Sequence, residues 1–284
     1  MPARRFVIGA MTDKGNLKTS NQDNILVKVG EGREGEFALF LVADGMGGLA
    51  AGEIASRIIA DDFSFWWSNN LSDLIHKDEN LNMGLLDFEL NNLVKSINGN
   101  IIDFGRSINE KAGSTLSMLF VYKNYYVIKH IGDSRIYLIN NTVTRLTEDH
   151  SWVAQQVKEG RLTEAEAKVH PKRNVLTRCL GVVENIQLYE KHGEVEPEDS
   201  FLICSDGFYN YVDEGEILES VSNCKKEDGD VQECLAKLLE EIKLRGAHDN
   251  VSAVLVNQCI VGSDGMRFPF KGVIKKITDS FVRW

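Results

Sequence analysis

The chain of 284 residues has few prolines, few cysteines and no long apolar run. It has four prolines and no stretch rich in Pro, Gly or Ser, so nothing in its composition indicates a linker that divides it. Its five cysteines are odd in number and scattered, and none forms a Cys-x-x-Cys pair, which predicts free thiols in a reducing cytosol. No apolar stretch reaches the roughly 18 residues that a membrane span needs. The first residues lack a long apolar segment, so we expect no signal peptide and a cytoplasmic protein.

Acidic residues outnumber basic ones, and the charge is uneven. The chain has a formal net charge of −10, whereas residues 262–284 hold five basic and two acidic residues, a net +3, which leaves −13 for the remainder. An acidic body argues against nucleic acid as a partner. With 43% hydrophobic residues, the chain can nevertheless bury a sizeable core.

Four aspartates stand at the ends of apolar, strand-like runs that are far apart in the sequence. They are Asp44, Asp133, Asp206 and Asp249. A carboxylate at the rim of a buried strand is costly unless a cation meets it. The pattern therefore predicts that these strand ends converge on a shared cation. Oxygen ligands without nearby His or Cys partners indicate Mg²⁺ or Mn²⁺ rather than zinc.

Two of these aspartates precede glycine, and an Asp-Gly pair is also an ordinary turn signal, because Gly accepts positive φ. The chain contains its own comparison at Asp264-Gly265, where no apolar run of strand length comes before. We interpret residues 264–265 as a turn and residues 206–207 as part of a site.

A series of nine short motifs extends over most of the chain. They are TDKG (12–15), SNQDN (20–24), VADGMGG (42–48), AGSTL (112–116), IGDSR (131–135), LTEDHS (146–151), HPKRNVLTR (170–178), CSDG (204–207) and HDNV (248–251). In this order and spacing, from about residue 5 to residue 257, the chain resembles the bacterial branch of the PP2C-type (PPM family) metal-dependent serine/threonine phosphatases. The resemblance implies an α+β, four-layer αββα sandwich of two antiparallel sheets flanked by helices, with the metal centre at one end between the sheets.

Sequence patterns predict where the elements lie. Strands are expected near 6–12, 24–29, 36–43, 114–122, 125–131, 135–140, 186–191, 200–205 and 251–257. Helices are expected near 49–68, 84–108, 151–158, 163–169, 213–222 and 230–245. The polar segments 69–83 and 223–230 are expected to be loops. Short turns between strands favour antiparallel pairing, as in an α+β layered domain.

The resemblance also implies a ligand set for two divalent ions, Mn²⁺ or Mg²⁺. Asp44, Asp206, Asp249 and the backbone carbonyl of Gly45 are the expected direct ligands. Asp23 is expected to act through a metal-bound water. Asp133 matches an aspartate that helps to hold a weaker third ion in many relatives, sharing it with Asp206.

The sequence departs from the family at three positions near this site. Gln22 stands where the family often has Glu, and Met46 where eukaryotic relatives carry a histidine proposed as general acid. Bacterial relatives usually place an arginine that grips the substrate phosphate five residues before the Asp of the opening motif, and here that residue is Lys18. We expect Lys18 to take this role, with a surface role as the alternative. In the latter case another cation would take over: Arg4, Arg5 or Lys14.

Two further candidates have a functional and a structural interpretation. His170 lies in a stretch that forms a mobile flap beside the active site of bacterial relatives, so it contacts substrate or a proton, or else packs or caps in a loop. Ser114 and Thr115 could suggest a nucleophile. No motif places a base near them, and we interpret them as the start of a core strand.

The resulting hypothesis is hydrolysis of phosphoserine and phosphothreonine in proteins, opposing a Hanks-type serine/threonine kinase. A catalytically weak or dead module that binds phosphoproteins is the alternative, and retention of the four aspartates argues against it. A small phosphomonoester also stays open as a substrate.

We expect a catalytic domain at residues 1–260 and a basic amphipathic tail at residues 261–284. Apolar residues recur at helical spacing in this tail, between basic ones. Such a tail folds back on the domain, docks on a partner or lies on a membrane surface.

Overall fold

The computed structural model describes residues 3–32, 35–46, 51–75, 81–226 and 229–261. Its strands are β1 (Ala3–Asp13), β2 (Asp23–Gly32), β3 (Gly35–Asp44), β4 (Leu116–Tyr122), β5 (Tyr125–Ile131), β6 (Arg135–Ile139), β7 (Val143–Arg145), β8 (Tyr189–Glu194), β9 (Ser200–Cys204) and β10 (Val251–Val261). Its helices are α1 (Gly52–Asn69), α2 (Leu71–Leu74), α3 (Met83–Ser107), α4 (Trp152–Lys158), α5 (Glu164–Val169), α6 (Asp206–Tyr209), α7 (Glu214–Lys226) and α8 (Val231–Leu244).

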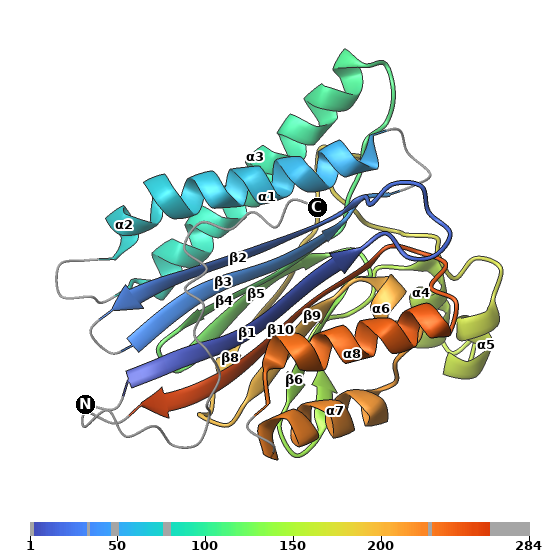
Figure 1. Ribbon diagram of the computed structural model, residues 1–284. Helices are drawn as coiled ribbons and strands as arrows, with labels where there is room; N and C mark the ends of the chain where they lie inside the picture. The colour runs from blue at the N-terminus through green and yellow to red at the C-terminus, as the bar shows by residue number, and fades with distance from the viewer. Residues whose placement is uncertain (1–2, 33–34, 47–50, 76–80, 227–228, 262–284) are drawn as a thin grey trace.

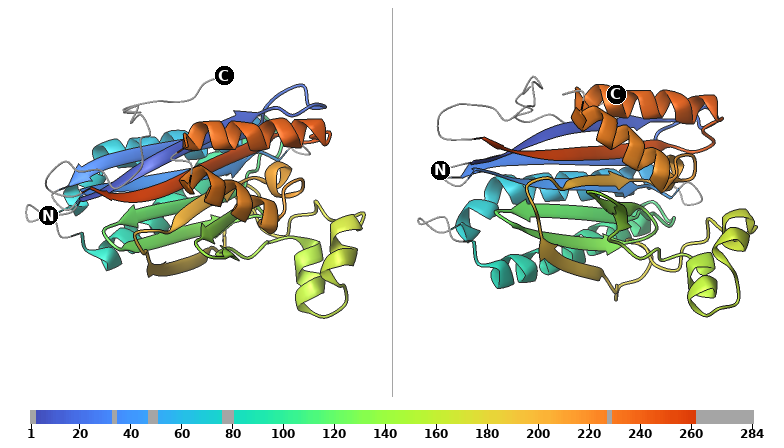
Figure 2. Two further views of the ribbon diagram at one scale, coloured as in Figure 1. Left: turned by 60° about the horizontal axis from the view of Figure 1, so that its bottom comes forward. Right: turned by 90° about the horizontal axis from the view of Figure 1, so that it is seen from below.

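The strands form one curled, hydrogen-bonded sheet whose two halves pack face to face (Figure 2). The strand order is β7-β6-β9-β10-β1-β3-β4-β5-β8, with β2 paired to β3. Among the described strands the pairings are antiparallel, except for a single parallel contact between Arg4 of β1 and Gly35 of β3 that joins the two halves. Each half therefore behaves as an antiparallel sheet.

Helices cover both outer faces (Figure 1). One apolar cluster lies between the two halves and includes Phe40, Ile128 and Phe201. A second joins α1 and α3 to β3, β4 and β5, and a third joins α7 and α8 to β1, β9 and β10. Three buried layers of side chains separate four layers of backbone, which confirms the predicted αββα sandwich.

The strand ends that carry the predicted aspartates lie at the same end of the sandwich. β3 ends there at Asp44 and β9 just before Asp206, whereas β10 begins there, two residues after Asp249. The α4–α5 hairpin, defined here as residues 151–178, projects from this end (Figures 1 and 2).

Three short elements and several element ends differ from the predictions. β8 begins and ends three residues later than predicted, and β10 continues four residues beyond its predicted end. α2 lies inside the predicted loop 69–83, where Leu71 and Leu74 are buried. α7 continues to Lys226, into the predicted loop that begins at residue 223. β7 and α6 were not predicted either. Elements of three or four residues are too short to show a helical or strand period, so tertiary contacts decide them.

No helix among the described residues is long and apolar enough to cross a membrane. All five cysteines are free thiols, as predicted. The expected basic tail lies, from residue 262 onward, outside the described residues.

A fully buried histidine gives the fold a dependence on pH. His130 Nε2 lies 3.0 Å from the carbonyl oxygen of Glu148, and Nδ1 lies 2.9 Å from Ser117 Oγ. Burial lowers the pKa of His130 from 6.5 to about 4. The unfolded chain therefore binds the proton more readily, so the contribution of neutral His130 to stability is full above pH 6.5 and is lost as the pH falls towards 4.

We expect wild-type protein to lose about 2 kcal/mol more unfolding free energy than His130→Gln between pH 6.5 and 4.5, because only the wild type must keep this imidazole neutral. Urea denaturation at both pH values measures the difference. Equal losses in the two proteins would contradict the assignment.

Candidate metal centre

Asp23 and Asp44 are direct partners across the β2–β3 pair. Like charges opposite one another destabilise a sheet unless a cation lies between them. The backbone fixes Asp44 firmly, since its N–H donates to Thr115 Oγ1 at 3.0 Å and its carbonyl accepts from Ser114 Oγ at 3.0 Å. Ser114 and Thr115 are buried and support Asp44, in agreement with their interpretation as the start of a core strand rather than a nucleophile.

Two glycines allow the segments of the site to approach closely. A Cβ on Gly45 would lie 2.3 Å from the carbonyl oxygen of Gly52, and a Cβ on Gly207 would lie 2.0 Å from that of Asn250. Both separations are shorter than any normal contact, so only glycine fits. The Asp-Gly pairs thus bring the end of β3 against the start of α1, and the start of α6 against the segment before β10. An ordinary turn does not need such a close approach of two backbone segments.

Polar side chains hold the remaining loops. Asn250 accepts from the N–H of Gln22 at 2.9 Å and donates to the carbonyls of Lys14 and Ser20, both at 3.0 Å, so it fixes the loop between β1 and β2. Ser205 Oγ donates to Asp23 Oδ2 at 2.9 Å. Neither Asn250 nor Ser205 has a role that the sequence alone predicts. Their position inside the CSDG and HDNV motifs was the available signal.

The carboxylates of this cluster repel one another in a poorly hydrated place. Burial first, and then the neighbouring aspartates, raise the pKa of Asp44 and of Asp206 well above its usual range. Burial likewise raises the pKa of Asp23 to about 6 and that of Asp133 to about 7. Each shift records a free-energy cost of ionising these groups without a cation.

The Lys18 ammonium lies against this cluster. Its Nζ is 2.6 Å from Asp249 Oδ1, and both side chains are part-exposed. Partial burial opposes the charged form, yet the pKa of Lys18 is raised because Asp249 bonds it and Asp44 and Asp206 lie near. The predicted phosphate cation thus stands within the group of predicted metal ligands.

The residues present fit divalent cations. Asp23 Oδ1 is buried and has no hydrogen-bond partner among the described residues. The donor set consists of carboxylate and carbonyl oxygens, which Mg²⁺ and Mn²⁺ prefer. One ammonium group is too little charge to neutralise five aspartates, so the centre is suited to further positive charge.

A second group of ligand-type side chains lies elsewhere and already has a cation in contact with it. Asp87, Glu190 and His192 place three ligand atoms within 4.8 Å of one another. The fully buried ammonium of Lys129 donates to Asp87 at 2.7 Å and to Glu190 at 2.5 Å. This lysine takes the place that a metal ion would need.

His170 lies within the α4–α5 hairpin. It is the C-cap of α5, its ring stacks on Trp152 at 4.9 Å between centroids, and its Nδ1 accepts from the N–H of Lys172 at 3.1 Å. These are packing and capping contacts. A substrate contact by His170 stays a prediction.

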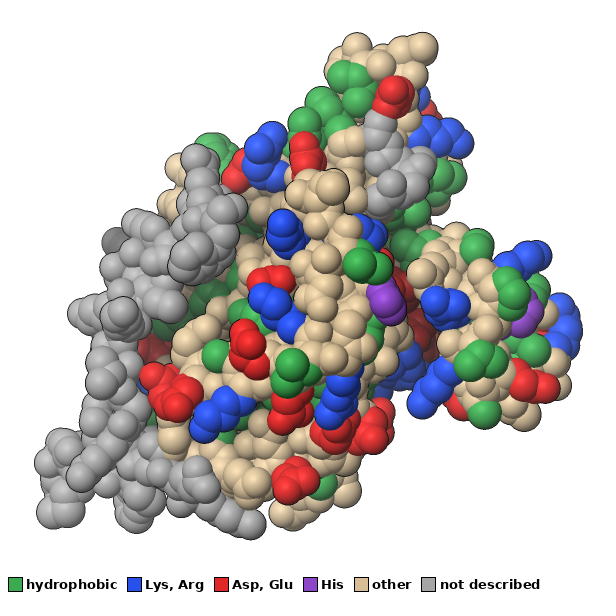
Figure 3. Space-filling view, turned by 45° about the vertical axis from the view of Figure 1, so that its right-hand side comes forward, with side chains coloured by type: hydrophobic (Ala, Val, Ile, Leu, Met, Phe, Trp, Pro, Cys, Tyr) green, Lys and Arg blue, Asp and Glu red, His purple; other side chains and the backbone are tan. Residues whose placement is uncertain are grey.

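The α4–α5 hairpin forms a lobe beside a hollow in the surface, and its basic side chains are visible in Figure 3. Six basic residues of the hairpin are exposed, against three exposed acidic ones (Glu159, Glu164 and Glu166): Lys158, Arg161, Lys168, Lys172, Arg173 and Arg178. The hairpin therefore presents positive charge on an otherwise acidic protein.

Comparison with known proteins agrees with this geometry. Residues 6–251 match the family described as Protein phosphatase 2C. Protein phosphatase PhpP of Streptococcus pneumoniae is 32% identical over 252 residues, which cover 88% of this chain and 96% of that protein. The serine/threonine phosphatase of S. agalactiae superposes with a TM-score of 0.76 at 29% identity and covers 89% of this chain and 99% of its own.

A further solved structure is the catalytic domain of the serine/threonine protein phosphatase PstP in complex with two manganese ions. It superposes with a TM-score of 0.71 at 28% identity and covers 91% of this chain and all of its own. The family match, the relatives and the shared fold agree over nearly the same residues. This chain therefore belongs to the protein phosphatase 2C family and is a metal-dependent protein serine/threonine phosphatase.

Proposed function

We propose that the cluster binds two divalent ions, Mn²⁺ or Mg²⁺, through Asp44, Asp206, Asp249 and the carbonyl of Gly45. Asp23 supports them from its buried position, and Asp133 shares a weaker ion with Asp206. The observation that carries this proposal is the convergence of buried and part-buried aspartates from distant segments, in which burial raises the pKa of Asp23, Asp44, Asp133 and Asp206. The complex of PstP with two manganese ions supports the number of ions.

Two such ions would supply positive charge that activates water and neutralises phosphate oxygens. The chain's own residues supply the rest. Ser205 and Asn250 fix Asp23 and the loop between β1 and β2, which limits reorganisation during the reaction. Lys18 Nζ, which lies 2.6 Å from Asp249 Oδ1, would be free to bind a phosphate oxygen if that carboxylate held an ion.

The substrates are phosphorylated proteins, and we propose phosphoserine and phosphothreonine sites made by a Hanks-type kinase as the specific class. The basic hairpin beside the cluster suits phosphorylated, acidic segments. Purified protein with Mn²⁺ should release phosphate from a phosphothreonine peptide faster than from a matched phosphotyrosine peptide. No release from either peptide would refute the proposal.

The cellular partner needs a different experiment. Phosphoproteomes of cells with and without the protein should differ at serine and threonine sites. A difference confined to small phosphorylated metabolites would instead identify a phosphomonoesterase.

Replacement of Lys18 tests the phosphate contact. Lys18→Ala should raise KM for phosphopeptides by roughly tenfold, the effect of losing one charge-assisted bond of about 1.5 kcal/mol. Lys18→Arg should preserve or improve kcat/KM, because guanidinium binds two phosphate oxygens at once. Steady-state kinetics at saturating Mn²⁺ measures both.

Lys14→Ala is the matched control, because Lys14 lies in the same loop with its side chain exposed. It should keep the wild-type KM. Unchanged KM and kcat in Lys18→Ala would assign the phosphate contact to another cation.

We also propose that the catalytic domain ends with β10, at Val261, and that the basic segment of residues 262–284 is a separate docking element. Deletion of residues 268–284 should then leave p-nitrophenyl phosphate turnover intact. A large loss of turnover would place the tail within the catalytic unit.

A further inference from the structure

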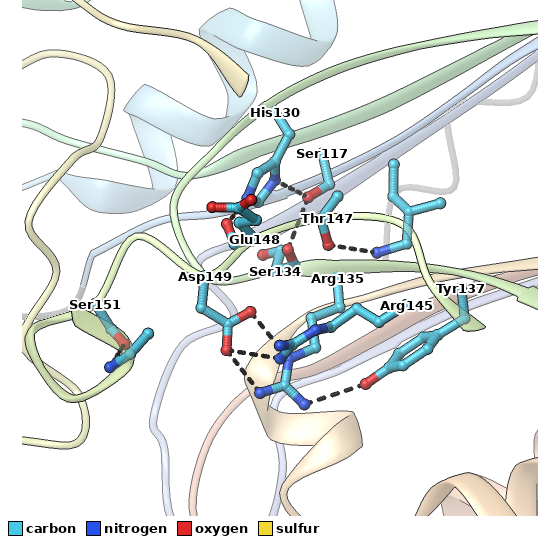
Figure 4. Close-up of polar contacts among 12 residues, drawn as sticks. Ser117, His130, Ser134, Arg135, Tyr137, Arg145, Thr147, Glu148, Asp149 and Ser151 are labelled. Carbon is cyan, nitrogen blue, oxygen red and sulfur yellow. Dashed lines mark hydrogen bonds and ion pairs between the residues drawn. The ribbon is translucent and has the colours of Figure 1, made fainter. Parts of the chain in front are cut away.

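Arg135 contacts the side chains of Asp149, Tyr137 and Tyr209 near the proposed metal centre, and the first two contacts are drawn in Figure 4. Its Nε and Nη2 donate to the two carboxylate oxygens of Asp149 at 3.1 and 2.7 Å. Its Nη1 donates to Tyr137 Oη at 3.1 Å, and its guanidinium carbon lies 3.6 Å from the centre of the Tyr209 ring. The planar guanidinium is therefore fixed along its edge and on its face.

Arg135 and two of its partners, Asp149 and Tyr209, belong to three different segments around the proposed site. Asp149 lies two residues before Ser151, the N-cap of α4, where the α4–α5 hairpin begins. Tyr209 ends α6, whose first residue is Asp206. Arg135 itself begins β6, two residues after Asp133. One side chain thus joins the hairpin to the segments of two proposed ligands.

A second contact closes this arrangement around Asp133. The N–H of His150 donates to the carbonyl of Gly132 at 2.7 Å, and the N–H of Gly132 donates to His150 Nδ1 at 3.1 Å. Gly132, directly before Asp133, and Arg135, two residues after it, are therefore held by the consecutive residues His150 and Asp149. A shift of the hairpin base moves the backbone that carries Asp133.

The Arg135–Asp149 pair is well suited to transmit position. The Asp149 side chain is 9% exposed and that of Arg135 21%, and a bidentate charge-assisted pair fixes both distance and plane. Arg145 also approaches Asp149, but through a single contact of 3.3 Å from a side chain that is 36% exposed. Arg145 offers a matched comparison on the same carboxylate.

We propose that Arg135 is a positioning residue that sets Asp133 and Asp206 for metal binding by fixing them to the base of the α4–α5 hairpin. This role rests on the proposed function, because it takes Asp133 and Asp206 as ligands. It predicts that the state of the hairpin and the affinity for the weakest-bound ion change together. Lysine cannot replace Arg135, since an ammonium group has neither the paired N–H donors that bind both carboxylate oxygens nor a planar face that stacks on Tyr209.

The test compares Arg135→Lys and Asp149→Asn with the control Arg145→Lys in the full-length protein. Calorimetry with Mn²⁺ measures metal affinity, and hydrogen exchange of residues 151–178 measures opening of the hairpin. Arg135→Lys and Asp149→Asn should each weaken the lowest-affinity Mn²⁺ by about tenfold, the lower end of the effect of losing a group that orients ligands. Both should also speed exchange in the hairpin, whereas Arg145→Lys should change neither by more than about twofold.

Turnover adds a third readout, since saturating Mn²⁺ should restore most of the lost kcat in Arg135→Lys. Wild-type Mn²⁺ affinity in both test variants would overturn the proposal, even if their melting temperatures fall. Equal losses in Arg145→Lys would also overturn it. Wild-type protein that binds Mn²⁺ without hydrolysing phosphopeptides would refute the proposed function, and the affinity and exchange comparison would still decide the role of Arg135.

Discussion

Asp206→Asn should lower kcat for p-nitrophenyl phosphate by at least about a hundredfold, because it removes a charge that holds a catalytic ion. Asp206 begins α6 just after β9, and burial, followed by the neighbouring aspartates, raises its pKa. The amide has nearly the same shape but no charge, so geometry is kept while affinity for the ion falls. Steady-state kinetics at a modest Mn²⁺ concentration measures the effect.

The same strand supplies the control. Asp199 lies at the other end of β9, where it is buried and accepts the N–H of Glu196 at 2.9 Å. Asp199→Asn is chemically the same change, far from the metal centre, and kcat should stay within about threefold of wild type. Near-wild-type turnover in Asp206→Asn, or an equal loss in Asp199→Asn, would show that the site is wrongly placed.

Removal of divalent ions should have the second large effect. After exhaustive treatment with EDTA, turnover should fall below about one percent of its starting value, since the chain's own cation at the cluster, Lys18, is a single charge. Mn²⁺ or Mg²⁺ should restore it, and Zn²⁺ should restore it less well, because the site has oxygen ligands alone. Recovery is followed with p-nitrophenyl phosphate after dialysis into each metal.

Without ions, the melting temperature should not favour the wild type over Asp206→Asn, although its turnover with ions does. In EDTA, Asp206→Asn should melt no lower than the wild type, because the amide relieves the repulsion that raises the pKa of Asp44 and of Asp206. Addition of Mn²⁺ should raise the melting temperature of the wild type more than that of Asp206→Asn, since an ion stabilises the folded state that binds it. A lower melting temperature for the variant in EDTA would contradict the electrostatic argument.

Much of the fold could be predicted from the sequence, because long periodic segments determine their own class. The strand of residues 36–43 and the helix of residues 84–108 were each placed to within about two residues of β3 and α3. α2, α6 and β7 were missed because three or four residues carry no period. The packing of the two sheet halves face to face was predicted from the family resemblance. Apolar spacing alone does not say which strands pair.

The cluster of acidic residues could be predicted from the sequence, whereas the side chains that support it could not. Asp44 and Asp206 were singled out because a carboxylate after an apolar run needs a cation, and their role as metal ligands stays a prediction. Ser205 and Asn250 could not be assigned roles, because their partners are 182 and 228 residues away in the sequence. Arg135 was visible in the IGDSR motif, but its pairing with Asp149 depends on how the hairpin base meets β6.

The most direct test of the metal centre is to count bound ions and measure turnover in the same samples. Metal-free protein is mixed with increasing Mn²⁺, bound manganese is determined by elemental analysis after gel filtration, and p-nitrophenyl phosphate hydrolysis is recorded. We expect turnover to rise steeply with the second bound ion and to be absent in Asp206→Asn at the same free Mn²⁺. Full turnover in wild-type protein that holds less than about one manganese ion per ten chains would contradict a two-metal phosphatase.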